Sequence, residues 1–532
     1  MKNGFSFICL LVALLTSCQK VDSPMKKSKV LRLNFPYDVS TLDPRKNSDY
    51  INSTVHFILF EGLTRMMPAS THELALAKSI DLSEDKKIYT FHLKETFWSD
   101  GAPVTAYDFL YSWKSVLDPG FPAPNAHLFY PIKNAEKVKR GLLPTEELGI
   151  QALDSLTLII TLEVPTPYFL DLTSFCPFFP VPSHIAKTAQ DWADRLTPLF
   201  VTNGPFLLKT LAFKSEYIFE KNPNYWDASS VKLDKIDIMV LDNELTALNL
   251  FENKELDFYG AYNSIPSDWA AKLKQEKKLI TQAFGATTFL TFNLNSFPFQ
   301  NKNIRKALSL AINRQLLVDN ITQCGETVAT GSIPPLLKPL SKKVFFTDND
   351  SALANQHLQL GLNELCITKT DLEKIVLSYP NNINSKRLAQ AIQQQWKQAL
   401  EITVRLEESE FKVLRERLVR KDYQIAFSSL VVQYNDQMNI LDRFKSRNNN
   451  FNYPGFENEE YINLLNRSSC AHDSEERFSI LEQAEQILTE EMPFTPLYHW
   501  NCVYLKQDRV HGLYISPIGS IHLNNIFLVE DI

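Results

Sequence analysis

The stretch Tyr89–Pro119 limits the possible folds of this chain more than any other segment of similar size. Apolar and polar residues alternate from residue 89 to 94, which is the pattern of a half-buried strand, and Ser99-Asp100-Gly101 provides a turn after it. Thr105 and Asp108 then have the spacing of a capping box, before a run whose apolar residues recur on one helical face. The sequence therefore predicts a strand, a tight turn and a capped helix.

The first 18 residues have the features of a bacterial lipoprotein signal. Lys2 supplies a positive charge, residues 5–15 form an apolar core too short to span a membrane stably, and Leu15-Thr16-Ser17-Cys18 resembles a lipobox. We therefore expect cleavage before Cys18, lipid on its thiol, and a soluble body held on the periplasmic, extracytoplasmic side of a membrane. An ordinary signal peptide with an incidental cysteine is the alternative interpretation.

The length and charge of the chain narrow its class. With 532 residues, the chain exceeds the roughly 250–300 residues at which a single hydrophobic core stops growing, so two or three domains are expected. The net charge of −6 comes without a long block of one sign, which argues against nucleic acid as a partner. Glycine is scarce, at 15 residues, and the glycine-rich loops that bind nucleotides are missing from the sequence.

Five cysteines remain once Cys9 is assigned to the signal and Cys18 to the lipid. An odd number cannot pair completely, and none is close enough to another to form a C-x-x-C unit. We expect scattered buried thiols, while one long-range disulfide stays open. The five are Cys176, Cys324, Cys366, Cys470 and Cys502.

No motif in the sequence indicates catalysis, a metal or a cofactor. The patterns G-x-S-x-G, H-E-x-x-H and G-x-x-x-x-G-K do not occur, and the ten histidines show no spacing of three or four residues suited to a metal. We therefore expect a protein that is not an enzyme and that holds neither a metal nor a cofactor.

Several segments of the chain resemble one family. Residues 98–108 read W-S-D-G-x-P-V-T-A-x-D, residues 202–206 read T-N-G-P-F, and residues 222–226 read N-P-N-Y-W. These blocks resemble, in order, segments of the oligopeptide- and dipeptide-binding proteins of ABC importers, an extracytoplasmic solute-binding family (family 5). The resemblance covers nearly the whole mature chain. It implies an α/β protein with a two-lobe periplasmic-binding-protein fold, type II-like, and an extra inserted domain.

The order of the expected elements agrees with this implied fold. Residues 375–379 have the pattern of a buried strand, Ser385 opens a helical stripe, and residues 402–406 alternate as the next strand, which implies a parallel pair with a helical crossover. By analogy with the family, the ligand is expected in a cleft between the lobes. The expected ranges are 1–18 for the signal, 29–65, 196–290 and 500–532 for the first lobe, 66–195 for the inserted domain, and 291–499 for the second lobe.

The resemblance also implies where a ligand is held. In the family, a peptide is bound as an extra strand through main-chain hydrogen bonds, and charged residues fix its two ends. Two segments of this chain match those that line the cleft, residues 45–50 and residues 410–436. The expected ligand-binding residues are Ser48, Asp49, Tyr50, Phe411, Arg417, Phe427, Ser429, Val431, Gln433, Tyr434, Asn435 and Asp436.

The second of these segments departs from the family pattern at charged positions. Gln433 stands where the family has the aspartate that pairs with the α-ammonium of the peptide, and Phe427 stands in place of an arginine. Phe411 replaces a tryptophan, and Arg417 flanks the position of a second arginine. Three explanations stay open: Asp436 supplies the missing charge, the ligand has no free α-ammonium (being modified, γ-linked or not a peptide), or ordinary peptides bind weakly through main-chain contacts. A register error of one residue would instead make Gln433 and Phe427 packing residues.

The sequence thus predicts a lipid-anchored, monomeric substrate-binding subunit of an ABC importer. It would capture oligopeptides or a peptide-like solute and deliver them to the permease and ATPase subunits in the membrane. The alternatives are a relative adapted to glutathione, haem or a metal chelate, and a surface-exposed adhesin or chaperone-like protein that reuses the fold. The identity, length and side-chain preference of the ligand are not predicted.

Overall fold

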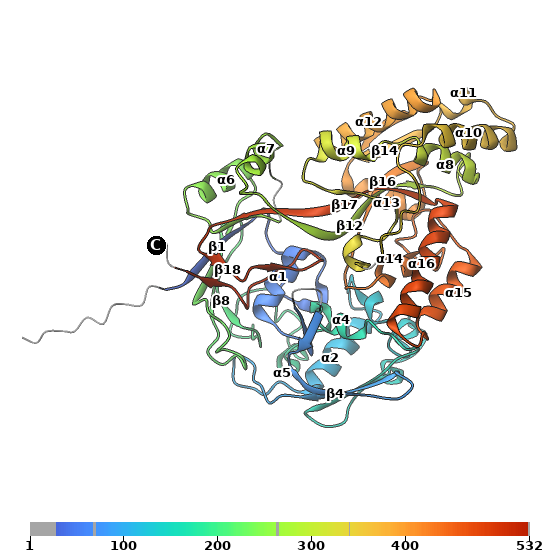
Figure 1. Cartoon of the computed structure of the whole chain (residues 1–532). Coiled ribbons are helices and arrows are strands. Elements are labelled where there is room, and N and C mark those ends of the chain that lie inside the picture. Colours follow the sequence, from blue (N-terminus) through green and yellow to red (C-terminus); the bar gives the residue numbers. More distant parts are fainter. Residues whose placement is uncertain (1–27, 68–70, 262–264, 266, 340, 530–532) are drawn as a thin grey trace, which may run out of the picture.

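The computed structural model describes residues 28–529, apart from 68–70, 262–264, 266 and 340. The expected signal and the expected lipid site at Cys18 lie outside the described residues. The described chain is a mixed α/β structure in which two lobes are joined by long strands and an additional domain lies against the first lobe (Figure 1).

The first lobe is built on a four-stranded sheet in the order β1-β10-β9-β8. The first strand pairs in parallel with β10, whereas β8, β9 and β10 form an antiparallel run. The chain therefore leaves this sheet after its first strand and returns about 170 residues later, because the inserted domain comes between. The strands are β1 (Val30–Phe35), β8 (Phe206–Ala212), β9 (Glu216–Lys221) and β10 (Lys235–Val240).

The inserted domain has its own antiparallel sheet in the order β4-β5-β7-β6, covered by α2 (Ala106–Leu117). Alternate residues of β5 are buried, as the sequence predicted, and the capping box of Thr105 and Asp108 is confirmed at the start of α2. Trp98 and Trp113 are fully buried in this domain. Its strands are β4 (Ala77–Leu82), β5 (Ile88–Leu93), β6 (Ile150–Ala152) and β7 (Thr157–Thr161), and its short helices are α3 (Ala135–Lys139), α4 (Phe169–Thr173) and α5 (Ser183–Ala186).

Two strands of 13 residues each, β12 (Ile280–Phe292) and β17 (Phe494–Lys506), run from one lobe to the other and pair antiparallel (Figure 1). They belong to a seven-stranded sheet in the order β11-β17-β12-β16-β14-β15, with β13 also paired to β17. The register between the two long strands shifts between Ala283 and Thr287 and again between Thr288 and Phe289. The lobes therefore share one sheet, and this sheet is irregular between them. The short partners are β11 (Phe258–Gly260) and β13 (Thr327–Val328).

The second lobe contains the predicted strand–helix–strand unit. The strand β14 (Val376–Pro380), the helix α12 (Ile383–Leu400) and the strand β15 (Arg405–Ser409) follow in order, and the two strands pair in parallel. The predicted cap at Ser385 is wrong: Asn382 caps the helix, and its side chain accepts from the amide of Ser385 at 2.8 Å. The strand predicted at 402–406 begins later, although Ile402 and Val404 are buried as expected. The unit continues with α13 (Phe411–Arg420) and β16 (Ile425–Val431).

The remaining elements surround these sheets. In the first lobe are α1 (Tyr50–Leu59), α6 (Glu244–Glu252), α7 (Ser267–Gln275), β18 (Val510–His511), β19 (Tyr514–Ile515), β20 (Ile521–His522) and β21 (Phe527–Leu528). The hairpin of β2 (Thr64–Met67) and β3 (Thr71–Leu74) leads from the first lobe into the inserted domain. In the second lobe are α8 (Lys302–Leu310), α9 (Arg314–Leu317), α10 (Ser351–Leu365), α11 (Lys369–Leu372), α14 (Met438–Leu441), α15 (Glu459–Ser468) and α16 (Ser474–Glu491).

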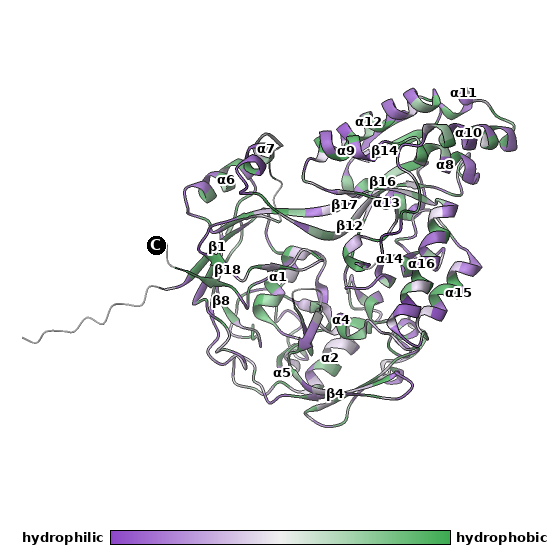
Figure 2. Ribbon diagram, in the orientation of Figure 1, coloured by the Kyte–Doolittle hydropathy of each residue, from purple (hydrophilic) through white to green (hydrophobic). Residues whose placement is uncertain are grey.

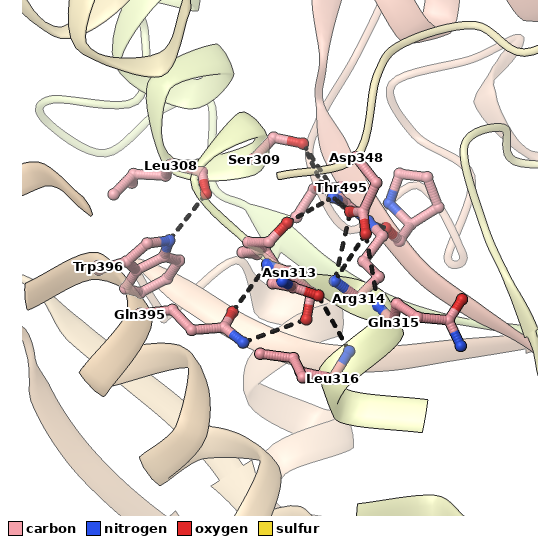
Figure 3. A network of polar contacts seen from close by, with 12 residues as sticks. Leu308, Ser309, Asn313, Arg314, Gln315, Leu316, Asp348, Gln395, Trp396 and Thr495 are labelled. Atoms are coloured by element: carbon pink, nitrogen blue, oxygen red, sulfur yellow. Dashed lines mark hydrogen bonds and ion pairs between the residues drawn. The ribbon is translucent and has the colours of Figure 1, made fainter. Parts of the chain in front are cut away.

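The buried guanidinium of Arg314 forms hydrogen bonds that connect β17 to the helices of the second lobe (Figure 3). Arg314 has no exposed side-chain surface, and it donates to the carbonyl of Pro496 at 2.6 Å and to the carboxylate of Asp348 at 2.8 Å. It also donates to the hydroxyls of Ser309 and Thr495. The hydroxyls of Ser309 and Thr495 also bond to each other, and Asp348 also accepts from the amides of Arg314 and Gln315. Because the guanidinium is fully buried and its donors find acceptors in this network, the network stabilises the junction.

The helices at the periphery carry both hydrophilic and hydrophobic residues, as expected for helices that pack on a core from one side (Figure 2). Within the described residues, no helix is both long enough and apolar enough to cross a membrane. The five cysteines are free thiols. The expectation that they are buried holds for Cys176 and Cys502 and is wrong for Cys366 and Cys470, which are exposed.

Candidate ligand-binding site

Side chains from several segments lie near the paired strands β12 and β17, between the lobes. We call Tyr50, Phe284, Thr288, Ser429 and Trp500 the interlobe surface. The rings of Phe284 and Trp500 stack with centroids 5.9 Å apart, the indole of Trp500 donates to Thr288 Oγ1 at 2.7 Å, and Thr288 shares a hydrogen bond with Ser429 at 3.3 Å. Aromatic rings and hydroxyls from separate segments thus lie side by side, and of these Phe284 and Thr288 are buried, Tyr50 and Trp500 are half-buried, and Ser429 is exposed.

The first-lobe wall of this surface is formed by the start of α1. Asp49 caps the helix by accepting from the amide of Asn52 at 2.9 Å, and this cap fixes the position of Tyr50. Burial raises the pKa of Tyr50, and Asp49 and Cys502 add to this shift, so the phenol is neutral and lies near β17. Burial also raises the pKa of Tyr37, with Tyr50 and Asp49 contributing, although about half of the Tyr37 side chain is exposed. Ser48 precedes the cap and is exposed.

The end of β16 and the residues that follow it alternate between two faces. Leu430, Val432 and Tyr434 are buried, whereas Ser429 is exposed and Val431 is half-buried. This alternation places the partly accessible residues 429, 431 and 433 on one face of the chain.

The main chain of β16 is open on one side at this point. The strand β14 pairs with only Ile425 and Ala426 of β16, so residues 427–431 extend beyond that pairing. On the other side, the amide of Val432 donates to the carbonyl of Gly285 in β12. Because the direction of main-chain groups alternates along an antiparallel pair, the main-chain groups of Ser429 and Val431 point away from β12.

Gln433 connects the second lobe to the inserted domain. Its Nε2 donates to Asn125 Oδ1 at 2.7 Å, and its Oε1 lies 3.1 Å from His127 Nε2. Asn125 Nδ2 in turn donates to the main-chain carbonyl of Asn47 at 2.9 Å. Burial lowers the pKa of His127, and the charge of Arg443 lowers it further, so the imidazole is neutral near pH 7. The position singled out from the sequence therefore holds an uncharged amide between another amide and a neutral imidazole, and the guanidinium of Arg443 is near enough to lower the pKa of that imidazole.

Asp436, the candidate for a replacement charge, is already paired. Its two carboxylate oxygens accept from Arg477 Nη1 at 2.7 Å and from Nη2 at 2.8 Å, in a bidentate pair that is largely buried. Tyr434 is buried and stacks on Tyr168 with centroids 4.7 Å apart, so its ring packs between the second lobe and the inserted domain. Neither side chain points freely toward the interlobe surface; Asn435, which lies between them, is half-buried.

Two of the expected ligand-binding side chains are placed differently from the prediction. Phe427 is only 5 % exposed and packs in the hydrophobic core of the second lobe, so its assignment as a ligand contact is wrong. Arg417 donates to Glu407 at 2.7 Å and to the carbonyl of Asp422 at 3.0 Å, so its guanidinium is already engaged within the second lobe. Phe411 is 61 % exposed at the start of α13, at the carboxyl end of the parallel strands where ligands of α/β sheets bind.

Several residues of the site were missed by sequence reasoning. They are Tyr37, Asn125, His127, Phe284, Thr288 and Trp500, which lie outside the two segments that matched the family cleft. Among the described residues, no group of three or more histidines, cysteines or acidic residues is placed to bind a metal.

Two α/β lobes joined by long shared strands, with an aromatic and hydroxyl-bearing surface at the junction, define a protein that binds a solute between its lobes. Residues 71–452 match the family described as bacterial extracellular solute-binding proteins, family 5, in its middle region. The chain belongs to this family.

The similarity to curated relatives extends over nearly the full length. The chain is 34 % identical to the oligopeptide-binding protein OppA of Bacillus subtilis over 507 residues, which cover 94 % of this chain and 93 % of that protein. It is 33 % identical to the dipeptide-binding protein DppE of the same organism, over 93 % of this chain and 91 % of that protein.

Solved structures are similar over the same extent. An oligopeptide-binding protein from Borrelia burgdorferi matches with a TM-score of 0.80 at 31 % identity, covering 94 % of this chain and 100 % of that chain. The OppA of Haemophilus influenzae, in complex with the peptide RPPGFSPFR, matches with a TM-score of 0.80 at 27 % identity, over 95 % and 99 % of the two chains.

Proposed function

We propose that this protein captures oligopeptides or a peptide-like solute between its lobes and delivers them to the membrane permease and ATPase of an ABC importer. It acts as a binding subunit and not as an enzyme. The names of the similar proteins support this proposal, and one of the structures holds a peptide. The observation that carries it is the main-chain edge of β16 at Ser429, which β14 does not cover and which lies beside the interlobe surface, because an extended peptide can add to such an edge as a further strand. The carbonyl of Val431 on the same edge already accepts from Arg443 at 2.7 Å.

Replacing Ser429 by proline is expected to weaken peptide binding by about tenfold. Proline removes the main-chain N–H that points away from β12, while the ladder between β12 and β16 is kept. Ser429→Ala is the matched control, since it removes the same hydroxyl but keeps the N–H. The measurements are titration calorimetry with a mixed peptide library and X-ray scattering, in which a bound peptide should reduce the radius of gyration. Equal binding by both variants, or no compaction with peptide, would contradict the proposed function.

We further propose that the mature chain is a monomer anchored to the membrane by lipid on Cys18, as residues 15–18 indicate. Cys18→Ser should move the protein from the membrane fraction to the soluble fraction, measured by fractionation and immunoblotting. Retention of the variant in the membrane fraction would argue against the anchor. Cys366→Ser, which changes an exposed thiol, is the control.

We also keep the expected domain ranges as a proposal. They are 29–65, 196–290 and 500–532 for the first lobe, 66–195 for the inserted domain, and 291–499 for the second lobe. Their support is that β1 and β8–β10 form one sheet, that β4–β7 form another within residues 66–195, and that the two long strands pass the limits near 290 and 500.

A further inference from the structure

Arg443 carries a buried positive charge that has no ion-pair partner among the described residues. The residue is 8 % exposed, and burial lowers the pKa of its guanidinium to about 10. Burial also acts to lower the pKa of Arg45 and of Arg477. Their ion pairs, with Asp43 and Asp436 respectively, outweigh this effect, so that both pKa values are raised. Since a desolvated cation is costly without a counter-ion, the described chain leaves the charge of Arg443 unbalanced.

The hydrogen bonds of Arg443 leave one of its terminal nitrogens without an acceptor in the described chain. Nε donates to the carbonyl of Asn439 at 2.8 Å, and Nη2 donates to Asn439 Oδ1 at 2.8 Å and to the carbonyl of Val431 at 2.7 Å. Nη1 donates to no described residue and is not fully enclosed. Burial lowers the pKa of Arg305 to about 10 as well, but all three of its nitrogens donate to main-chain carbonyls. Arg443 therefore keeps N–H groups for a further acceptor.

This guanidinium lies at the end of the uncovered edge of β16. The main-chain groups of Ser429 and Val431 both point away from β12, and the carbonyl that accepts from Arg443 is that of Val431. Alternate residues of a strand are about 6.6 Å apart. An extended solute that adds to the edge at Ser429 therefore reaches Arg443 within about two residues.

The surroundings of Arg443 do not supply an anion. Its guanidinium carbon lies 5.0 Å from the ring centre of Phe451, and that ring lies 5.9 Å from the imidazole of His127 in the inserted domain. Asp442, the preceding residue, acts on the pKa of Arg443 from a distance but forms no ion pair with it among the contacts of the described chain. The guanidinium is thus placed between the second lobe and the inserted domain, beside the β16 edge.

The hydrogen bond to Val431 determines what a solute must present at this point. In an uninterrupted ladder, the carbonyl of Val431 would accept from an N–H of the added strand. Because Arg443 already donates to this carbonyl, the solute instead meets the N–H groups of a guanidinium. A group that accepts hydrogen bonds and carries a negative charge matches both the open donors and the unbalanced charge. A carboxylate has these properties, whereas an amide N–H or a cation does not.

We propose that Arg443 binds a carboxylate of the captured solute at the end of the β16 edge, and that the protein therefore selects acidic ligands over ligands in which this carboxylate is an amide. This inference rests on the proposed function and specifies its ligand class. The carboxylate is either the end of a peptide chain or an acidic side chain, because both sources present the same chemistry to the guanidinium.

The test compares peptides that differ in one carboxylate. Tripeptides to pentapeptides are prepared as free acids and as carboxy-terminal amides, and the amides are prepared with glutamate or glutamine at each position in turn. Binding to the full chain is measured by calorimetry and by native mass spectrometry. We expect the carboxylate to be favoured by about tenfold or more in one of these two comparisons. A preference in the first identifies the chain end as its source, and a preference in the second identifies a side chain.

The other results separate this inference from the proposed function. Equal binding in both comparisons, or tighter binding of the amides, would overturn the inference and leave the proposed function intact. Binding of no peptide would overturn both.

Three variants test the residue assignment. Arg443→Gln removes the charge and should reduce the ratio of the two affinities toward one, whereas Arg443→Lys keeps the charge and should keep the preference for the carboxylate. The matched control is Arg447→Gln, which should leave the ratio unchanged, because the side chain of Arg447 is 56 % exposed and pairs with Glu457 at 3.4 Å. A purely structural role of Arg443 would weaken the binding of both forms equally. An unchanged ratio in Arg443→Gln, with folding verified by circular dichroism, would therefore overturn the assignment.

Discussion

Replacing Arg314 by methionine is expected to lower the free energy of unfolding by about 3–5 kcal/mol. The side chain is fully buried, and its removal leaves the carbonyl of Pro496, the hydroxyls of Ser309 and Thr495, and one side of Asp348 without their donor. Methionine fills much of the volume, so the loss reports the polar network and not a cavity. Urea denaturation followed by circular dichroism measures the change.

The control for this variant is Arg420→Met in the same lobe. Arg420 is 77 % exposed, and its contact with Glu416 at 3.8 Å lies on the surface, so the expected change is below about 0.5 kcal/mol. If the Arg314 variant were as stable as the Arg420 variant, the network would not hold β17 in place. Because Thr495 and Pro496 belong to β17, the loss should also loosen the connection between the lobes.

Replacing Gly285 by alanine is expected to cost about 1–3 kcal/mol of stability and to weaken peptide binding by about tenfold or more. A β-carbon at this position would lie 2.1 Å from Val432 Cγ2 and 2.8 Å from the carbonyl of Pro517, and both neighbours are held in place. The amide of Gly285 donates to that carbonyl, and its own carbonyl accepts from the amide of Val432. The added methyl group therefore displaces the strand end that carries Gln433.

The matched control is Gly120→Ala, since a β-carbon there would approach only Asp118 Oδ1, at 3.2 Å, in an exposed turn. It should change stability by less than about 0.5 kcal/mol and leave binding unchanged. Thermal melting and calorimetry with the peptide library measure both quantities. Normal binding by Gly285→Ala would show that the position of the strand end does not matter for the ligand.

Much of the fold could be predicted because its signals are local. The alternation in β5, the capping box of α2 and the parallel pair β14 and β15 all follow from residues that are close in sequence. The cap of α12 was misplaced by three residues because Asn382 and Ser385 are both good capping residues, and only the helix geometry decides between them.

The site was less predictable because its contacts join distant parts of the chain. Gln433 meets Asn125 and His127 across about 300 residues, and no periodicity connects them. The sequence does not show that Asp436 is paired, because its partner Arg477 lies 41 residues later, on another helix. Phe427 matched a family cleft position, but its side chain packs in the core of the second lobe.

The shift in register between β12 and β17 has a mechanical consequence. The paired strands β12 and β17 connect the two lobes. We expect this pair to bend most easily where its hydrogen-bond ladder is interrupted, between Ala283 and Thr287. Phe284 lies inside that interval, and its ring stacks on Trp500. The interruption of the ladder and the stacked aromatic pair therefore coincide, and we expect the packing of these two rings to limit bending between the lobes at this point.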